Sequence, residues 1–245
     1  MGAARVLRAV LGRMISDFVH TTQEQRVVFG VGSLSRLGAE LDALGLQRSL
    51  ILTTPEQAST AHELAATLSP RACGVYDRAA MHVPVATVEE AHSLAVSRSA
   101  DCCIAIGGGS TTGLAKAIAL QLDMPIVAVP TTYAGSEMTT IYGITGNGSK
   151  KTGRDKRVLP STVIYDPALT VGMSATQSAA SGFNAIAHCV EALYAPDRNP
   201  LVALLAEEGV RVLAAALPVI SQNPSDLNAR SEALLGAWLA GMSLS

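Results

Sequence analysis

The sequence predicts an α/β protein, in which a parallel sheet with crossover helices precedes an all-helical part. Three observations lead to this prediction. Short β-branched runs alternate with Ala/Leu-rich runs from Arg26 to Pro167. From Ser174 to Ser245 only helical runs remain. Hydrophobic residues make up 49% of the chain and aromatic residues only 4%, so small aliphatic side chains must fill the core, as they do between parallel strands and helices.

Within the first part, each element is justified by its own local signal. Ser33 is the expected N-cap of a helix that Gly45 ends, and Pro55 opens the next helix. A further helix is expected to begin at Thr87, because Glu90 three residues on has the capping-box spacing. The expected strands are 26–30, 49–54, 74–76, 102–107, 125–130 and 161–167, helices are expected at 33–44 and 110–120, and 139–160 is expected to be a loop or a hairpin.

The change of character near residues 166–174 predicts the domain organisation. Residues 1–25 are an extension and first segment, 26–170 an α/β domain, and 171–245 a helical domain with helices over 176–195, 199–221 and 226–243. The last helix reaches Ser245 without a capping glycine or a polar tail, so we expect the helical domain to be incomplete. We expect an apolar face of that helix to lie bare and to drive association, most simply as a homodimer. This face consists of Leu234, Leu235, Trp238 and Leu239.

Composition argues against several classes of function. The formal net charge is −2 without a long basic run, which argues against a nucleic-acid partner. No apolar stretch has transmembrane length, so no membrane partner is expected. The four cysteines form no CxxC pair, and Cys102 and Cys103 lie in an apolar run, which fits a cytoplasmic protein without disulfides or zinc. Residues 1–13 carry three arginines and no acid, and we interpret them as a flexible extension rather than a transit peptide; Met14 is an alternative start.

The stretch IAIGGGS (104–110) places three glycines between a buried strand and the start of a helix. Glycine allows a close approach of the backbone to a ligand, and a helix N-terminus offers free N–H groups to an anion. A tight structural turn is the alternative, but three glycines are more than a turn needs. The motif is not GxGxxG, and Gly30-x-Gly32 after the first strand is only a partial echo of it. The expected pyrophosphate-binding residues are Gly107, Gly108, Gly109 and Ser110.

The stretch VPTTYAGSEMT (129–139) follows the next strand at its carboxyl end. Ligands of open α/β sheets bind at this edge, so the hydroxyls of Thr131, Thr132 and Thr139 are candidates to bind ribose or phosphate. Taken alone, the stretch is as consistent with a plain polar loop. Beside the glycine turn, it favours a binding site.

These two stretches, GGGSTTGLAK (107–116) and VPTTYAGSEMT (129–139), resemble the cofactor signatures of the iron-containing alcohol dehydrogenases. In that family the first cradles the pyrophosphate and the second lines the nicotinamide side. KKTGRDKRVLPSTVIYDPAL (150–169) and SGFNAIAHCVEALYAP (181–196) are similar to the maleylacetate reductase branch of the family. The resemblance runs from about residue 26 to 245. It implies a Rossmann-like N-terminal domain, a helical C-terminal domain, and an active site between them.

The resemblance also implies NADH or NADPH as the hydride donor. Lys150 resembles the family lysine near the cofactor, and Lys151 competes with it in register. Thr54 stands at the end of the second strand, where NAD-specific members carry an aspartate near the ribose. Threonine brings no negative charge against a 2′-phosphate, so use of either cofactor is expected. Gly113 stands where many members have aspartate, which alters either packing or a ribose contact.

The sequence departs from the family at its metal ligands. Iron-dependent members carry an aspartate and a histidine four residues apart, and two later histidines. Here the pair is Asn184 and His188, and no histidine follows His188. An amide is a much weaker ligand than a carboxylate, so no metal is expected. We assign His188 as catalytic and place it with Asn184 in the substrate pocket, where Glu191 could orient the imidazole; a hydrogen-bonded core histidine is the alternative.

The function that the resemblance implies is hydride transfer from NAD(P)H to maleylacetate, a small dicarboxylate, giving 3-oxoadipate in the degradation of aromatic compounds. Two alternatives stay open. One is an iron-type dehydrogenase of a small alcohol, which Asn184 argues against. The other is a truncated chain that binds nucleotide without turnover. The remaining histidines, to which no role is assigned, are His20, His62, His82 and His92.

Overall fold

The structure is a computed structural model that describes residues 18, 20–146, 148–196 and 198–245. The predicted extension at residues 1–13 and the alternative start at Met14 lie outside these described residues. Six parallel strands form one sheet in the order β1-β8-β5-β4-β2-β3. The strands are β1 (Arg26–Phe29), β2 (Ser49–Leu52), β3 (Ala72–Tyr76), β4 (Cys102–Gly107), β5 (Ile126–Pro130) and β8 (Thr162–Tyr165). The predicted parallel sheet is therefore confirmed.

Helices cover both faces of the sheet, and alternate side chains of each inner strand enter the two resulting cores. In β4, Ile104 and Ile106 face one core and Cys103 faces the other. The first core is covered by α2 (Leu37–Ala43) and α3 (Ala58–Thr67), and the second by α4 (Val85–Ser97) and α5 (Gly109–Leu122). The two central strands, β4 and β5, are buried throughout, which explains why they appear in the sequence as continuous apolar runs.

Two predicted N-caps are wrong. The helix expected from Ser33 is a 3₁₀ turn, Ser33–Arg36, that leads into α2, and the Ser33 hydroxyl donates to the carbonyl of Tyr165. The helix expected from Thr87 begins two residues earlier, at Val85, with Pro84 at the cap position and no side-chain cap. Pairing with β6 holds the residues just before this helix, since the Thr145 N–H donates to the Val83 carbonyl over 3.0 Å. This pairing, and not a side-chain cap, positions the start of the helix.

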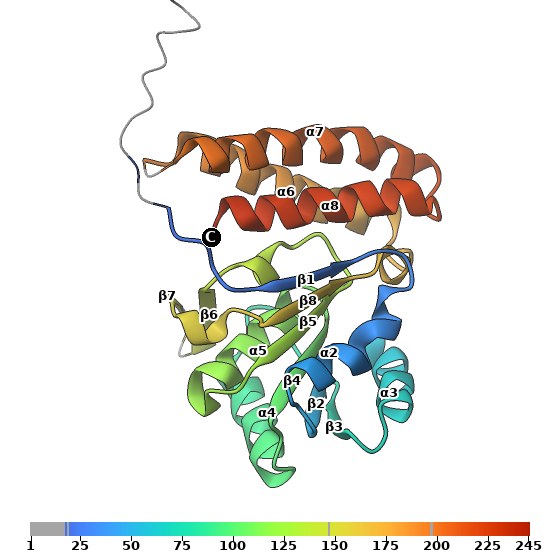
Figure 1. Cartoon of the computed structure of the whole chain (residues 1–245), viewed down its shortest axis with the longest axis vertical. Helices are drawn as coiled ribbons and strands as arrows, with labels where there is room; N and C mark the ends of the chain where they lie inside the picture. The colour runs from blue at the N-terminus through green and yellow to red at the C-terminus, as the bar shows by residue number, and fades with distance from the viewer. Residues whose placement is uncertain (1–17, 19, 147, 197) are drawn as a thin grey trace, which may run out of the picture.

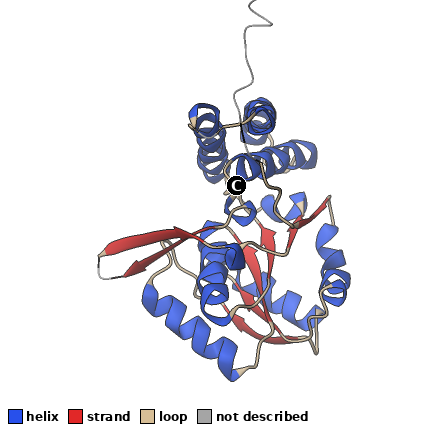
Figure 2. Cartoon of the chain, turned by 60° about the vertical axis from the view of Figure 1, so that its left-hand side comes forward, coloured by secondary structure: helices blue, strands red, loops and turns tan. Residues whose placement is uncertain are grey.

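The segment between β5 and β8 contains a two-stranded antiparallel hairpin, β6 (Ile141–Gly146) and β7 (Ser149–Arg154). Of the loop and hairpin alternatives, the structure therefore selects the hairpin. Figure 2 shows it extending away from the main sheet. This hairpin carries both lysines that competed for the cofactor role.

The helical part consists of α6 (Ala175–Tyr194), α7 (Pro200–Gln222) and α8 (Leu227–Ser243), which lie as a separate layer beside the sheet (Figure 1). Their shared core includes Val163 and Tyr165 of β8, so the helices cover the part of the sheet that α5 leaves open. The expectation of a bare apolar face on α8 is wrong. Leu234 is 0% and Leu239 8% exposed, and Trp238 packs against the same core. Leu235 and Trp238 are half-buried, so the face that was expected to bind a partner is largely covered within this chain.

Arg230 of α8 connects the helical part to the loop after β5. Its side chain is fully buried and its guanidinium donates to Tyr133 Oη (3.0 Å), Ser178 Oγ (2.7 Å) and the carbonyls of Met173 and Pro224. A buried guanidinium requires such a complete set of acceptors.

Among the described residues, no helix is both long and apolar enough to cross a membrane.

Candidate cofactor site and active site

The glycine turn leads from the last residue of β4, Gly107, into the first residue of α5, Gly109. Gly107 has φ +152°, and a Cβ there would overlap the hydroxyl of Thr111. A Cβ on Gly108 would lie 3.0 Å from Cγ2 and Oγ1 of Thr132. Both glycines therefore allow close packing of this turn, and Gly109 itself is exposed. The first N–H groups of α5 have no acceptor within the helix and remain available to a ligand.

The loop after β5, residues 131–139, is called the threonine loop below. It packs directly against the glycine turn. The Thr131 N–H donates to the Gly107 carbonyl over 2.9 Å. The Thr131 hydroxyl contacts Gln57, whose Nε2 donates to it over 3.0 Å. Gln57 belongs to the 3₁₀ turn after β2 that Thr54 precedes, so the ends of β2, β4 and β5 meet at one edge of the sheet. The structure thus brings the predicted Thr54, Thr131 and Thr132 close to the glycine turn.

Thr139 is placed differently from the expectation. It is buried, and its hydroxyl accepts from the Lys116 ammonium over 3.1 Å and donates to the Ser136 carbonyl. Lys116 also donates to the carbonyls of Ser136 (2.7 Å), Thr139 (2.6 Å) and Ile141 (2.7 Å). Thr139 therefore serves to hold Lys116 beneath the loop, and its hydroxyl has no free position for ribose or phosphate.

Burial lowers the pKa of Lys116 to about 7, and the neighbouring Glu137 carboxylate opposes this shift. Glu137 is itself buried and accepts a hydrogen bond from Tyr165 Oη over 2.7 Å. Desolvation raises the pKa of Glu137. Lys116, Glu137 and Tyr165 form a buried polar cluster that links α5, the threonine loop and β8. This cluster supports the loop that borders the site.

A pocket of about 330 Å³ opens beside the amino end of α5. Gly109 and Ser110 line one part of it, Lys150 of β7 another, and His82 of the loop before α4 a third. Lys151 is not among its lining residues, so of the two lysines it is Lys150 that the structure places at this pocket. The buried hydroxyls of Thr111 and Ser136 make no hydrogen bond to any described residue. Ser136 lines the pocket, so its unpaired hydroxyl fits a site that a polar ligand completes.

Asn184 and His188 lie one turn apart on α6, as their spacing predicts. Asn184 Nδ2 and His188 Nε2 are 3.0 Å apart, and His188 Nδ1 is 3.9 Å from Glu191 Oε2. The amide nitrogen can only donate, so the neutral ring carries its proton on Nδ1, towards Glu191. The imidazole is 30% exposed between two exposed polar neighbours, which excludes the core-histidine alternative.

The family that the sequence resembles is named for iron, and the described residues do not fit an iron site on their own. They contain no group of three or more His, Cys, Asp or Glu side chains placed to hold a metal ion. Asn184 directs an N–H, not an oxygen, at His188 Nε2. The pair therefore presents one imidazole that is already hydrogen-bonded and one weak amide ligand.

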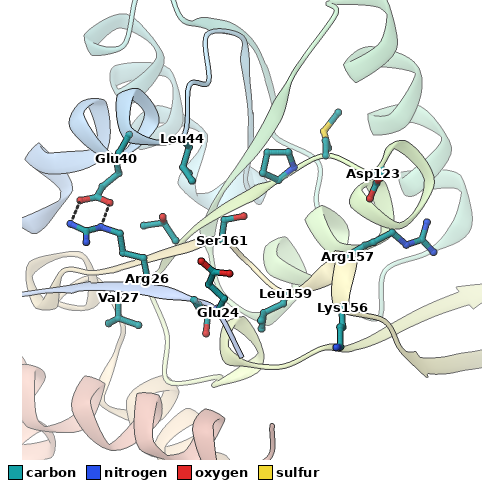
Figure 3. A pocket seen from close by; sticks show the side chains of 15 residues that line it. Glu24, Arg26, Val27, Glu40, Leu44, Asp123, Lys156, Arg157, Leu159 and Ser161 are labelled. Carbon is teal, nitrogen blue, oxygen red and sulfur yellow. Dashed lines mark hydrogen bonds and ion pairs between the residues drawn. The ribbon is translucent and has the colours of Figure 1, made fainter. Parts of the chain in front are cut away.

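A larger pocket, of about 890 Å³, lies at the opposite edge of the sheet. It is lined by residues at the amino ends of β1, β5 and β8, among them Arg26, Pro125 and Thr162 (Figure 3). Arg26 is paired with Glu40 over 2.6 Å, so its charge is neutralised within the protein. Ligands of parallel sheets bind at the carboxyl ends of the strands, and this pocket is therefore not the candidate site.

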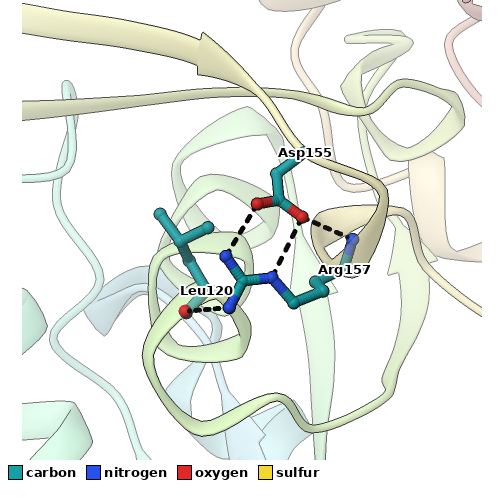
Figure 4. A network of polar contacts seen from close by, with 3 residues as sticks. All are labelled: Leu120, Asp155 and Arg157. Carbon is teal, nitrogen blue, oxygen red and sulfur yellow. Dashed lines mark hydrogen bonds and ion pairs between the residues drawn. The ribbon is translucent and has the colours of Figure 1, made fainter.

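Arg157, which lines that same large pocket, serves to hold the end of the hairpin against α5. It forms a two-pronged ion pair with Asp155, at 2.7 and 3.1 Å, and donates to the Leu120 carbonyl over 3.1 Å (Figure 4). The guanidinium lowers the pKa of the Asp155 carboxyl. These contacts account for part of the basic segment at 150–157 without any ligand.

The partial glycine motif after β1 also has a structural explanation. The Asp166 carboxylate accepts from the N–H groups of Gly32 (2.9 Å) and Leu34 (3.1 Å). A protein carboxylate thus occupies the donors that a phosphate would need. Sequence reasoning did not identify Gln57, Lys116 or Arg230. Only Lys116 had a usable signal, as a single charge in the apolar run of α5.

Comparison with known proteins agrees with this architecture. Residues 24–167 match the family model described as iron-containing alcohol dehydrogenase. Residues 178–245 match the model for the C-terminal part of the Fe-containing alcohol dehydrogenase family. The chain is 56% identical over 227 residues to a maleylacetate reductase of Burkholderia cepacia, covering 93% of this chain and 64% of that protein. A maleylacetate reductase of Sphingobium indicum is 56% identical over 225 residues, again with 64% of its length covered. The chain thus spans about two thirds of the length of these relatives.

Solved structures show the same relationship. Maleylacetate reductase from Rhizobium sp. strain MTP-10005 is 50% identical, with a TM-score of 0.92 over 94% of this chain and 66% of that one. Sulfoacetaldehyde reductase from Bifidobacterium kashiwanohense, in complex with NAD+, shares the fold at 22% identity and a TM-score of 0.87 over 94% of this chain and 67% of that one. The family models, the fold and the glycine turn agree, and the chain belongs to the iron-containing alcohol dehydrogenase family.

Proposed function

We propose that this protein is an NAD(P)H-dependent reductase that acts on maleylacetate, a small dicarboxylate. The observation that carries the proposal is the pocket beside α5, where the glycine turn, Ser110 and Lys150 present hydrogen-bond donors at the carboxyl edge of the sheet. A dinucleotide pyrophosphate is the ligand that such a site suits. The relatives named maleylacetate reductase, 50–56% identical in Burkholderia, Sphingobium and Rhizobium, support the choice of substrate.

NADH is the better cofactor of the two that the sequence allows. Thr54 carries no charge, but the exposed carboxylate of Glu56 lies two residues on, and interaction with the Thr54 side chain lowers the pKa of Glu56. A carboxylate therefore lies near the position proposed for the ribose. Its negative charge disfavours the 2′-phosphate of NADPH, as an aspartate or glutamate does in classical NAD sites.

When bound, the reduced nicotinamide supplies the hydride for the carbon–carbon double bond of the substrate. The protein binds and orients both reactants. The first N–H groups of α5 and the Lys150 ammonium hold the cofactor phosphates. Asn184 and His188 offer an amide and an imidazole to a substrate carboxylate. We assign to His188 the proton that completes the reduction, since its imidazole lies beside Asn184 and carries an N–H.

The cofactor site is tested by titrating NADH and NADPH while following nucleotide fluorescence. Gly108→Asp places a carboxylate against Thr132 and beside the phosphates, so we expect binding to fall at least about ten-fold. Lys150→Met is expected to weaken binding by a similar factor. Lys151→Met is the matched control, because Lys151 is the neighbouring residue of β7 and does not line the pocket. Equal affinity of the wild type and Gly108→Asp would refute the cofactor site.

Three expectations about the whole protein stay proposals. We propose a homodimer in a reducing cytoplasm, and all four cysteines are unpaired in the structure. We also propose metal-independent chemistry, in contrast to the name of the family. Light scattering and maleylacetate-dependent oxidation of NADH test the assembly and the reaction separately.

A further inference from the structure

The loop between β3 and α4 contains two consecutive residues in a left-handed backbone conformation. His82 has φ +65° and Val83 φ +50°. Residues other than glycine seldom adopt this conformation, and for a β-branched residue such as valine it is a true outlier. Such backbone strain persists only where the surrounding structure holds it in place.

Three contacts hold this turn. The Val83 N–H donates to the Ala80 carbonyl over 3.2 Å, and the Val83 carbonyl accepts from the N–H of Thr145 in β6 over 3.0 Å. The Val83 side chain is 5% exposed and packs on α5, where a Cβ on Gly113 would lie 2.7 Å from its Cγ2. With Val83 buried between helix and hairpin, the neighbouring His82 is directed to the pocket beside α5.

The His82 side chain has no structural role of its own. It is exposed, and its imidazole makes no hydrogen bond to any residue that the structure describes. It lines the 330 Å³ pocket together with Gly109, Ser110 and Lys150. None of the described residues that line this pocket is acidic. The charged and polar groups around His82 therefore favour an anion, and the imidazole adds one more donor for it.

We propose that His82 is a cofactor-binding residue, which donates a hydrogen bond to the pyrophosphate of the bound dinucleotide alongside Lys150 and the amino end of α5. This inference rests on the proposed function of the pocket as the NAD(P)H site. The strained turn exists to present this side chain, with Val83 as its buried anchor. Hydrogen bonds to a charged phosphate are the strong ones, so the loss of one has a measurable effect on affinity.

The test compares His82→Gly and His82→Phe with the wild type in NADH titrations and in thermal unfolding. Glycine adopts a positive φ freely, so His82→Gly is expected to weaken NADH binding about ten-fold without lowering the unfolding midpoint. Phenylalanine keeps a ring but has no N–H, so the same loss of affinity is expected for His82→Phe. The control is His62→Phe, at an exposed histidine of α3 that does not line the pocket, and its affinity is expected to match the wild type.

A second ligand, inorganic pyrophosphate, separates this inference from the proposed function. If the wild type binds NADH and both His82 variants bind it equally well, the role of His82 is overturned while the cofactor site stands. If His82→Phe alone retains wild-type affinity, the side chain acts by packing and the hydrogen bond is overturned. If pyrophosphate raises the unfolding midpoint of the wild type more than that of His82→Gly, but NADH does not bind, the His82 site stands and the proposed function fails. If neither ligand binds the wild type, both proposals are overturned.

Discussion

Lys116 is the residue whose chemistry differs most from what its sequence position suggests. An ammonium at the end of a flexible side chain normally lies in water, whereas this one is 1% exposed and faces three backbone carbonyls and a hydroxyl. Those carbonyls belong to Ser136, Thr139 and Ile141, so one side chain holds the threonine loop and the start of the hairpin together. The last residue of the predicted cofactor motif therefore both lines the pocket and holds the loop beside it.

The depressed pKa of Lys116 predicts a dependence of stability on pH. The folded-state pKa is about 7 and the ordinary value is 10.5. Between these values the unfolded chain binds a proton that the folded chain does not, so the free energy of unfolding rises with pH from about 7 to 10.5 and falls on acidification towards 7. This contribution is up to about 1.4 kcal/mol per pH unit.

Urea unfolding at several pH values between 7 and 9.5 gives the free energy of unfolding of the wild type and of Lys116→Met. The difference between the two isolates the contribution of Lys116, because ionisation of the cysteines affects both proteins equally. We expect the variant to lack the rising component, whereas Lys151→Met keeps it. The same slope in the wild type and Lys116→Met would show that Lys116 stays charged in the folded protein.

Among the elements, α5, the 77–84 loop and the hairpin depend on one another. Val83 packs into the space that Gly113 leaves on α5, and β6 pairs with the Val83 carbonyl. The sequence left open whether glycine at position 113 alters packing or a ribose contact. The contact with Val83 favours packing, because Gly113 leaves the space that the valine fills. The start of α4 is a consequence of the same contact, since the hairpin positions the chain just before that helix.

The packing of Gly113 against Val83 predicts that the effect of Gly113→Ala on the free energy of unfolding changes sign when Val83 is replaced by alanine. Alanine is a better helix residue than glycine by about 1 kcal/mol, but its Cβ would lie 2.7 Å from Val83 Cγ2. Gly113→Ala is therefore expected to destabilise the wild type by about 1–2 kcal/mol. In the Val83→Ala background the obstacle is gone, and the same change is expected to stabilise the protein. Urea unfolding of the four proteins provides the measurement, and additive effects would disprove the contact.

At the scale of the whole molecule, the helical part is bound to the sheet through a shared core and the buried Arg230. Leu234 and Leu239 of the apolar stripe of α8 are buried and Leu235 and Trp238 are half-buried, so the stripe is not the bare face that would drive association. Most of the large apolar side chains that remain exposed on the helical part lie on α6 and α7, including Phe183, Tyr194 and Leu204, and Leu227 is exposed at the start of α8. The predicted homodimer thus stays a prediction, without the reason that the sequence offered for it.

The metal content is a property of the whole protein and can be measured directly. Asn184 donates to His188 Nε2, and the described residues contain no group of three metal-binding side chains. We expect purified protein to contain far less than one iron or zinc per chain. Elemental analysis checks this. About one metal per chain that is lost in His188→Ala would contradict metal-independent chemistry, and Asn184→Asp is expected to raise the metal affinity by restoring a carboxylate.

The sequence by itself determined the class of the fold, the order of its strands along the chain and the place of the glycine turn. These follow from local signals, because a buried strand requires a continuous apolar run and a helix requires its own period. The spacing of Asn184 and His188 likewise placed both on one helix face without further information. The family signatures predicted the cofactor edge for the same local reason.

Only the tertiary structure decided the contacts between distant segments. The pairing of Gln57 with Thr131 joins residues 74 positions apart, and that of Gly32 with Asp166 spans 134. The register of the hairpin placed Lys150 and not Lys151 at the pocket, and packing of the helices covered most of the apolar face of α8. A sequence pattern shows which side chains need a partner, but the partner is chosen by the arrangement of elements in space, because burial and hydrogen bonding depend on what each side chain meets.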